Sequence, residues 1–259
     1  MGRTERPNRK CPMPRLQLST WQEVDTYLHS RRDIIMPIGS TEQHGPNGLI
    51  GTDSICPEII ANGVEEKSGV MVGPTLSIGM AQHHMAFAGT ITYRPQVLIE
   101  TLKDVVASLT KHGFERIYFL NGHGGNIATI TAAFNEIYTE SSLKGSNRPF
   151  RLKLQSWFMG RRFREISKEL YGDSEGSHAT PSEVSLSYYA YPDFVKKAEM
   201  SPKIAAKGPI RDADDYRRRF PDGRIGSDPS LSTVAHGERI YHASVEDMAE
   251  DLKAFVDEA

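Results

Sequence analysis

The chain has 259 residues, of which 38% are hydrophobic and 25% charged, so it is an ordinary globular protein with either one large α/β domain or two small ones. The formal net charge of -2 provides no basic field for nucleic acid, and no apolar run reaches the roughly 18 residues needed to cross a bilayer. We therefore expect neither a nucleic-acid partner nor a membrane.

The N-terminal tail and the cysteines point to a cytoplasmic location. Residues 1–14 are polar and basic without an apolar segment, so they do not form a secretory signal. The only cysteines are Cys11 and Cys56, which excludes a disulfide framework and favours a reducing compartment. Cys56 lies close in sequence to Asp53, but we expect it to be a small buried side chain rather than part of a site.

Predicted strands and helices alternate along most of the chain. Short apolar or β-branched runs predict strands at 32–38, 70–78, 89–93, 116–120 and 151–158. Helical spacing and end signals predict helices at 54–67, from Pro95 to a stop at Gly113, at 127–139, from 159 to 170, at 181–191, and from Ser244 with Asp247 in a capping box. This alternation predicts a single α/β domain over 1–259, a layered sandwich in which helices flank a central, mostly parallel β-sheet.

The segment 203–237 has a different composition, dominated by glycine, proline and charge. We interpret it as a long loop, or as an arm that reaches a neighbouring subunit. Its arginines in 211–224 could bind an anionic substrate, but charge runs commonly face water, so a solvated or interface loop is the preferred interpretation. Asp212, Asp214 and Asp215 could neutralise these arginines locally.

Three short clusters carry acids and imidazoles beside glycines, at 39–45, 121–126 and 177–183. The first two follow the predicted strands that end near Ile38 and Leu120. Because sites in parallel sheets form at the carboxyl ends of strands, we expect the clusters to assemble one site. Their content of His, Glu and Asp indicates a metal.

Five side chains without a thiolate are the candidate ligands: Glu42, His44, Asp53, His123 and Glu183. Such a set suits zinc, manganese or iron(II). One catalytic tetrahedral ion needs only three protein ligands, so five ligands with one bridging carboxylate predict two divalent ions per subunit. The ions would activate a shared water as a hydroxide nucleophile, and His178 would carry a proton to the leaving nitrogen.

Each cluster taken alone has a plainer interpretation. Residues 121–126 could form a tight turn or a phosphate cradle, although they have neither the glycine spacing of a dinucleotide site nor the lysine of a P-loop. His178 could be a core histidine, and Glu183 an acid that complements a helix dipole. Two rival functions follow: a non-catalytic ligand-binding or scaffold protein on this fold, and a nucleotide-dependent oxidoreductase, for which the sequence has no acceptable fingerprint.

The motifs resemble those of the creatininase (creatinine amidohydrolase) family at 37–46 with Asp53, at 121–126 and at 178–185. The resemblance implies an α/β fold, a dinuclear metal centre that hydrolyses amide-type C–N bonds, and assembly as a homo-hexamer. It further implies that Glu42 and His123 bind one ion, that His44 and Glu183 bind the other, and that Asp53 bridges them.

The resemblance also implies roles around the substrate. His178 matches the family's substrate-side histidine, and His84, within a segment that resembles one near the family's pocket, is a better match than His83. Gly124 stands where creatininase has an aromatic ring that shapes the creatinine pocket, and Gly125 stands where it has an acid.

The two glycines at 124 and 125 argue against creatinine as the substrate. They resemble a broader branch of the family, which includes formamide-type deformylases of ring-opened pyrimidines and a peptidase of redox-cofactor maturation. We therefore expect a cytoplasmic amidohydrolase that cleaves a non-peptide or cyclic amide or formamide bond in a small molecule. Short peptides are the alternative substrate class.

Overall fold

The computed structural model describes residues 15–143, 145 and 150–258, so the predicted polar tail and Cys11 lie outside the described residues. Its centre is a parallel sheet of four strands in the order β2-β1-β3-β4. The strands are β1 (Asp33–Ile38), β2 (Met71–Val72), β3 (Arg116–Asn121) and β4 (Arg151–Ser156). In the register, Ile38 pairs with Asn121 and Asn121 with Ser156, so three strands end at the same edge.

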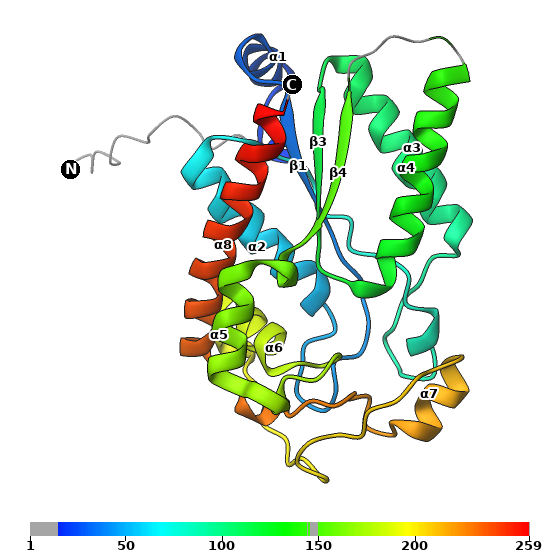
Figure 1. Ribbon diagram of the computed structural model, residues 1–259, viewed down its shortest axis with the longest axis vertical. Helices are drawn as coiled ribbons and strands as arrows, with labels where there is room; N and C mark the ends of the chain where they lie inside the picture. The colour runs from blue at the N-terminus through cyan, green and yellow to red at the C-terminus, as the bar shows by residue number, and fades with distance from the viewer. Residues whose placement is uncertain (1–14, 144, 146–149, 259) are drawn as a thin grey trace, which may run out of the picture.

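Helices cover both faces of this sheet, which confirms the predicted layered α/β architecture (Figure 1). Along one face lie α2 (Thr52–Ser68), α5 (Arg161–Tyr171), α6 (Pro181–Ala190) and α8 (Val234–Asp257). Against the other face pack α1 (Trp21–Ser30), α3 (Pro95–His112) and α4 (Ile127–Leu143). No helix in the described ranges is both long and apolar enough to cross a membrane.

The core explains why β1 is a continuous apolar run. All six of its residues are buried, with Ile35 in the apolar cluster beneath α2 and α8, and Ile34 and Met36 in the cluster beneath α3. A strand covered on both faces has no side that tolerates polar residues. Cys56 is fully buried in the first cluster, as predicted.

Two predicted strands differ from the structure. The strand expected at 70–78 is reduced to Met71–Val72, because Pro74 has no N–H for the ladder and pairing resumes only where Leu76 N donates to Pro37 O. The stretch 89–93 is not a strand; Ile91 and Thr92 form only isolated bridges, and the chain turns at Gly89 with a φ of 88°.

The last helix begins ten residues earlier than predicted, at Val234, where the Thr233 side chain accepts a hydrogen bond from His236 N. The predicted cap at Ser244 is wrong because Asp247 serves another helix: its Oδ2 accepts from Phe163 N in the first turn of α5 at 3.0 Å. Gly237 permits close packing, since a Cβ there would lie 2.0 Å from Ser185 O of α6.

The segment 203–237 folds back onto its own chain and contains a short helix, α7 (Ala213–Arg219) (Figure 1). Ile225 bridges to His178, and Ser227 Oγ donates to the carbonyl of His178 at 2.7 Å. The segment therefore forms a wall beside the third polar cluster. Two of its arginines, Arg218 and Arg219, are neutralised locally by Asp215, one of the three acids expected to do so.

Candidate metal centre

The five candidate ligands converge at the carboxyl edge of the sheet. Glu42 and His44 lie in the loop after β1, and Asp53 lies in the first turn of α2. His123 follows β3, and Glu183 lies in the first turn of α6, which Pro181 opens. Glu42 is 0% exposed and the other four are buried or nearly so, which is exceptional for acids and requires compensation by opposite charge.

Asp53 belongs to two groups of ligand atoms. One consists of Glu42, Asp53 and His123 and the other of His44, Asp53 and Glu183, with all atoms in each group within 4.8 Å of one another. Asp53 Oδ1 lies 3.0 Å from His44 Nε2, and Asp53 Oδ2 lies 2.9 Å from His123 Nδ1. The two oxygens of one carboxylate therefore face two different imidazoles.

The protons of both imidazoles are held on the outer side of the cluster. His44 Nδ1 lies 3.0 Å from the carbonyl of Glu42, and His123 Nε2 lies 2.9 Å from the carbonyl of Met80. Each of these nitrogens donates to a carbonyl, so in the neutral rings the inward nitrogens carry lone pairs.

These inward lone pairs face oxygens that are themselves acceptors. Glu42 Oε1 and Asp53 Oδ2 are buried and have no hydrogen-bond donor in the described part of the chain. Converging acceptors without hydrogens repel one another unless a cation lies between them. The donor set therefore fits divalent metal ions.

The pKa values of the imidazoles in the metal-free cluster also indicate that the carboxylates require positive charge. Burial alone would lower the pKa of His44, but the facing Asp53, Glu183 and Glu42 carboxylates outweigh it and raise the pKa to about 10. For His123 the same opposition, with Glu42 and Asp53, raises the pKa to about 9. Without metal, protons supply the charge that the carboxylates require.

Glu183 is oriented by the end of its own helix. Its Oε1 accepts from Thr180 N at 2.6 Å, and Thr180 Oγ1 accepts from Glu183 N, which together form a capping box. Burial raises the pKa of Glu183 to about 7. The carboxylate lies 4.0 Å from His44 Nε2 and completes the second group of ligand atoms.

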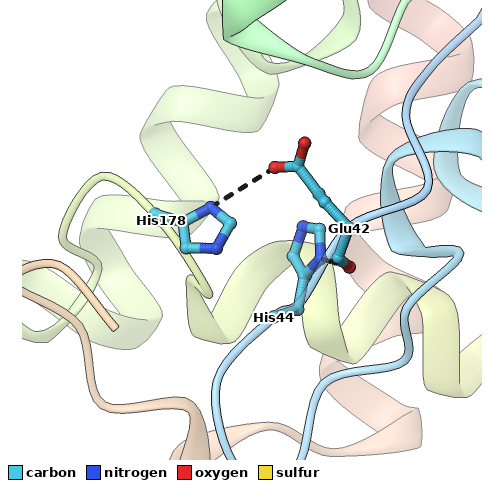
Figure 2. A group of neighbouring side chains, drawn as sticks. All are labelled: Glu42, His44 and His178. Atoms are coloured by element: carbon cyan, nitrogen blue, oxygen red, sulfur yellow. Dashed lines mark hydrogen bonds and ion pairs between the residues drawn. The ribbon is translucent and has the colours of Figure 1, made fainter. Parts of the chain in front are cut away.

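His178 lies beside this cluster as a neutral imidazole. Its Nε2 donates to the carbonyl of Gln43 at 2.8 Å, and its Nδ1 points toward the Glu42 carboxylate, 3.9 Å from Oε1 (Figure 2). Burial, reinforced by the neighbouring His84 and His44, holds the pKa of His178 well below its ordinary value. The free nitrogen of His178 is therefore an acceptor that faces the candidate metal site.

Gln43 was not predicted and is the hub of the surrounding hydrogen bonds. Its Nε2 lies 2.9 Å from His84 Nδ1 and 3.0 Å from Gly223 O, and its Oε1 accepts from Gly45 N. His84 Nδ1 is therefore an acceptor, so its Nε2 carries the hydrogen and lies 3.0 Å from Glu42 Oε1 without the geometry of a hydrogen bond. The available signal was the position of Gln43 between the two ligands of the first motif.

A cavity of about 660 Å³ opens onto the cluster and is lined by Asp53, His123, His178 and Glu183. His84 is almost fully buried and Gly124 is exposed, and both line this cavity, as does the half-buried His83. Tyr216 of α7 and Ile225 contribute the wall formed by the segment 203–237. No sequence pattern indicated Tyr216, because it lies within the charged segment interpreted as a loop.

Comparison with known proteins places this fold and site in a family. The model of the creatininase family, described as creatinine amidohydrolase, matches residues 17–252. Creatinine amidohydrolase of Pseudomonas putida is 25% identical over 90% of this chain and 94% of its own length. Mycofactocin precursor peptide peptidase of Mycobacterium ulcerans (strain Agy99) is 26% identical over 83% and 82%.

The solved structure of the manganese form of creatininase has the same fold, with a TM-score of 0.82 at 23% identity over 95% of this chain and 99% of that one. The family match extends over most of the sequence and includes all three polar clusters. This chain belongs to the creatininase family of hydrolases.

Proposed function

We propose that this protein is a metal-dependent amidohydrolase with two divalent ions per chain. Glu42 and His123 would hold one ion, and His44 and Glu183 the other, with Asp53 between them. The placement of the Asp53 carboxylate supports two sites. Its Oδ1 lies 3.0 Å from His44 Nε2, and its Oδ2 lies 2.9 Å from His123 Nδ1. The oxygen and imidazole donors suit zinc, manganese or iron(II).

Bound there, the ions would lower the pKa of a shared water and polarise a carbonyl oxygen. His178 accepts a proton at Nδ1 and donates it to the nitrogen that leaves, because its Nε2 is engaged with Gln43 O. His84 lies against the cluster, with its Nε2 3.0 Å from Glu42 Oε1, and its place in the cavity lining makes it a candidate contact for substrate.

We propose a non-peptide or cyclic amide or a formamide in a small molecule as the substrate. The cavity volume of about 660 Å³ suits such a molecule. Gly124 has no atom within 4 Å of the place where a Cβ would stand, so the cavity has no ring there of the kind that shapes the creatinine pocket. Short peptides are the second candidate, favoured by the mycobacterial relatives that are mycofactocin precursor peptide peptidases.

The expected homo-hexamer and cytoplasmic location are also proposals, which rest on the family resemblance and on cysteine usage. Sedimentation analysis of the purified protein would test the hexamer. Fractionation of the native host would test the location.

The test of the proposed function combines metal analysis with turnover. The wild type, Glu42→Gln, His123→Ala and Asp53→Asn would be compared for metal content and for hydrolysis of creatinine, formamidopyrimidines, simple formamides and short peptides. We expect close to two ions per wild-type chain, about one in Glu42→Gln and His123→Ala, and less than one in Asp53→Asn, with turnover lost in all three variants.

A matched control is Glu66→Gln, which removes an exposed acid of α2 that is not among the ligand atoms. Full metal content and unchanged turnover in the ligand variants would contradict the proposal. Tight binding of an amide by the metal-loaded wild type without any product would favour the non-catalytic ligand-binding protein instead.

A further inference from the structure

One face of α5 directs two basic side chains into the cavity that contains the candidate metal centre. Arg164 and Lys168 are four residues apart, so they lie one turn apart on the same side of the helix. Both are exposed and both line the cavity together with His123, His178 and Glu183.

The remaining basic residues at the start of α5 already have carboxylate partners. Arg161 pairs with Glu165 at 2.9 Å, and Arg162 pairs with Asp247 and Glu250 of the adjacent α8 (Figure 1). These pairs neutralise the parts of the helix that face solvent and α8.

Arg164 and Lys168, by contrast, form no ion pair within the described residues. Arg164 donates from Nε to Gly160 O at 3.3 Å, and neither of its terminal guanidinium nitrogens has a protein acceptor in this part of the chain. The cavity therefore contains two cations whose charge is not balanced by a direct partner.

The other charged groups of the cavity wall form no ion pair with Arg164 or Lys168 in the described part of the chain. Glu175 accepts a hydrogen bond from Ser182 at the start of α6, and Asp173 is exposed without an ion pair among the described residues. In the segment 203–237, Arg218 and Arg219 pair with Asp215, Arg217 lies over the ring of Phe87, and Arg224 is fully buried against Asp222. None of the arginines of this segment lines the cavity. The anionic-substrate interpretation that the sequence suggested for 211–224 thus fits α5 better.

We propose that the substrate carries an anionic group, a carboxylate or a phosphate, which Arg164 and Lys168 bind while the scissile amide lies at the metal cluster. The guanidinium of Arg164 provides a planar pair of donors, and the ammonium of Lys168 provides a point charge. The aromatic side chains of Trp157 and Phe158 line the same cavity and suit the apolar body of a small molecule. This inference rests on the proposed amide hydrolysis and specifies its substrate class.

The test uses substrate pairs that differ only in charge, with metal-loaded full-length protein. One pair is N-formyl-β-alanine and N-formylpropylamine; the other is the phosphate ester of N-formylethanolamine and N-formylethanolamine itself. The measured quantity is the ratio of kcat/KM for the charged member to kcat/KM for the neutral member. The two pairs distinguish a carboxylate from a phosphate.

In the wild type we expect a ratio well above one for at least one pair, because charge-assisted hydrogen bonds discriminate strongly. In Arg164→Gln/Lys168→Met the ratio should fall by about tenfold or more. Arg161→Gln, on the same helix but outside the cavity lining, should leave the ratio unchanged. Lys168→Glu should shift the preference toward the cationic N-formyl-1,3-diaminopropane.

A wild-type ratio of one in both pairs, or a ratio that the double variant does not change, would overturn the inference. Dissociation constants of the corresponding N-acetyl compounds, measured by calorimetry, give a second readout that does not need turnover. If the double variant loses the charge preference in binding, the inference is supported even when no formamide is hydrolysed. The lack of hydrolysis would then contradict the proposed activity only. Equal binding of charged and neutral ligands by the wild type contradicts the inference alone.

Discussion

The carbonyl of Gln43 accepts a hydrogen bond from Nε2 of His178 at 2.8 Å, and this contact leaves Nδ1 of His178 without a hydrogen. The backbone thereby selects one tautomer of a neutral imidazole and aims its lone pair at the metal-ligand cluster. The side-chain Nε2 of Gln43 also lies 2.9 Å from this nitrogen, so Gln43 contacts His178 through both its main chain and its side chain.

Replacement of His178 by Gln removes this acceptor and should lower kcat by about 10²–10⁴-fold, as expected for the loss of a proton-transfer group. Metal content should remain as in the wild type, because the two groups that share Asp53 are complete without His178, which belongs only to a third group of neighbouring ligand atoms, with Glu42 and His44. Steady-state kinetics and metal analysis check both points. His112→Gln, an exposed change at the end of α3, is the control; equal kcat in both variants would rule out this role for His178.

Metal binding should release protons and strengthen with pH. In the metal-free protein the pKa values of His44 and His123 are about 10 and 9, so both rings are protonated at pH 7.5 and must lose a proton to bind an ion. Apparent affinity should therefore rise from pH 6 toward pH 9. Calorimetry in two buffers of different ionisation enthalpy should show release of about two protons.

The variant His44→Gln provides the comparison for this measurement, because it lacks one titrating ring. It should release about one proton less than the wild type under the same conditions. Metal affinity that is independent of pH over this range would contradict the assigned protonation states.

Adjacent glycines of the second motif should respond in opposite ways to alanine. A Cβ on Gly125 would lie 2.3 Å from His123 Nε2 and 2.8 Å from Met80 O, whereas a Cβ on Gly124 would meet nothing within 4 Å. Gly125→Ala should displace His123, reduce metal content and destabilise the fold by about 1–3 kcal/mol. Gly124→Ala should keep the wild-type metal content and melting temperature.

Metal analysis and thermal unfolding of the two variants check this prediction. The same clash bears on Gly125 itself, at whose position the resemblance to creatininase implies an acid. With the His123 ring placed as it is, that position admits only a hydrogen atom, and Glu183 supplies the acid from α6. Equal metal content in Gly125→Ala and Gly124→Ala would show that the ring can shift without loss.

Glu175 should make the protein less stable as pH rises. Burial raises its pKa to about 7 despite the hydroxyls that bond it, so the folded protein binds its proton more tightly than the unfolded chain. Its contribution is fully present below the ordinary glutamate pKa of 4.5 and is lost as pH rises through about 7. Glu175→Gln mimics the protonated acid and should stabilise the protein at pH 8 by on the order of 2 kcal/mol.

Near pH 4.5 the two proteins should have similar free energies of unfolding. Chemical denaturation at both pH values measures the difference. Asp173→Asn, a change of the exposed acid nearby, controls for general charge effects. A stabilisation by Glu175→Gln that is the same at both pH values would show that the carboxyl does not titrate in this range.

The sequence predicted those parts of the fold that local patterns determine. The apolar run of β1 and the helix from Pro95 to Gly113 were predicted because burial and end signals lie within the segment itself. The start of α8 was not, because Asp247 acts on α5 and Gly237 packs against α6, and both contacts are made by residues distant in sequence.

The candidate site likewise contains residues that the sequence indicated and residues that it did not. Glu42, His44, Asp53, His123 and Glu183 stand out as acids and imidazoles beside glycines, and they do come together. Arg164 and Lys168 do not stand out, because basic residues on an amphipathic helix ordinarily face water. Only the placement of α5 beside the cavity distinguishes these two from Arg161 and Arg162.

Arg224 connects two parts of the chain that form the cavity wall contributed by the segment 203–237. Its guanidinium, 0% exposed, donates to the carbonyls of Pro202, Lys203 and Ser227 and pairs with Asp222. Moving this buried guanidinium into solvent would leave all of these acceptors without a donor. This side of the cavity is therefore preorganised before any ligand binds.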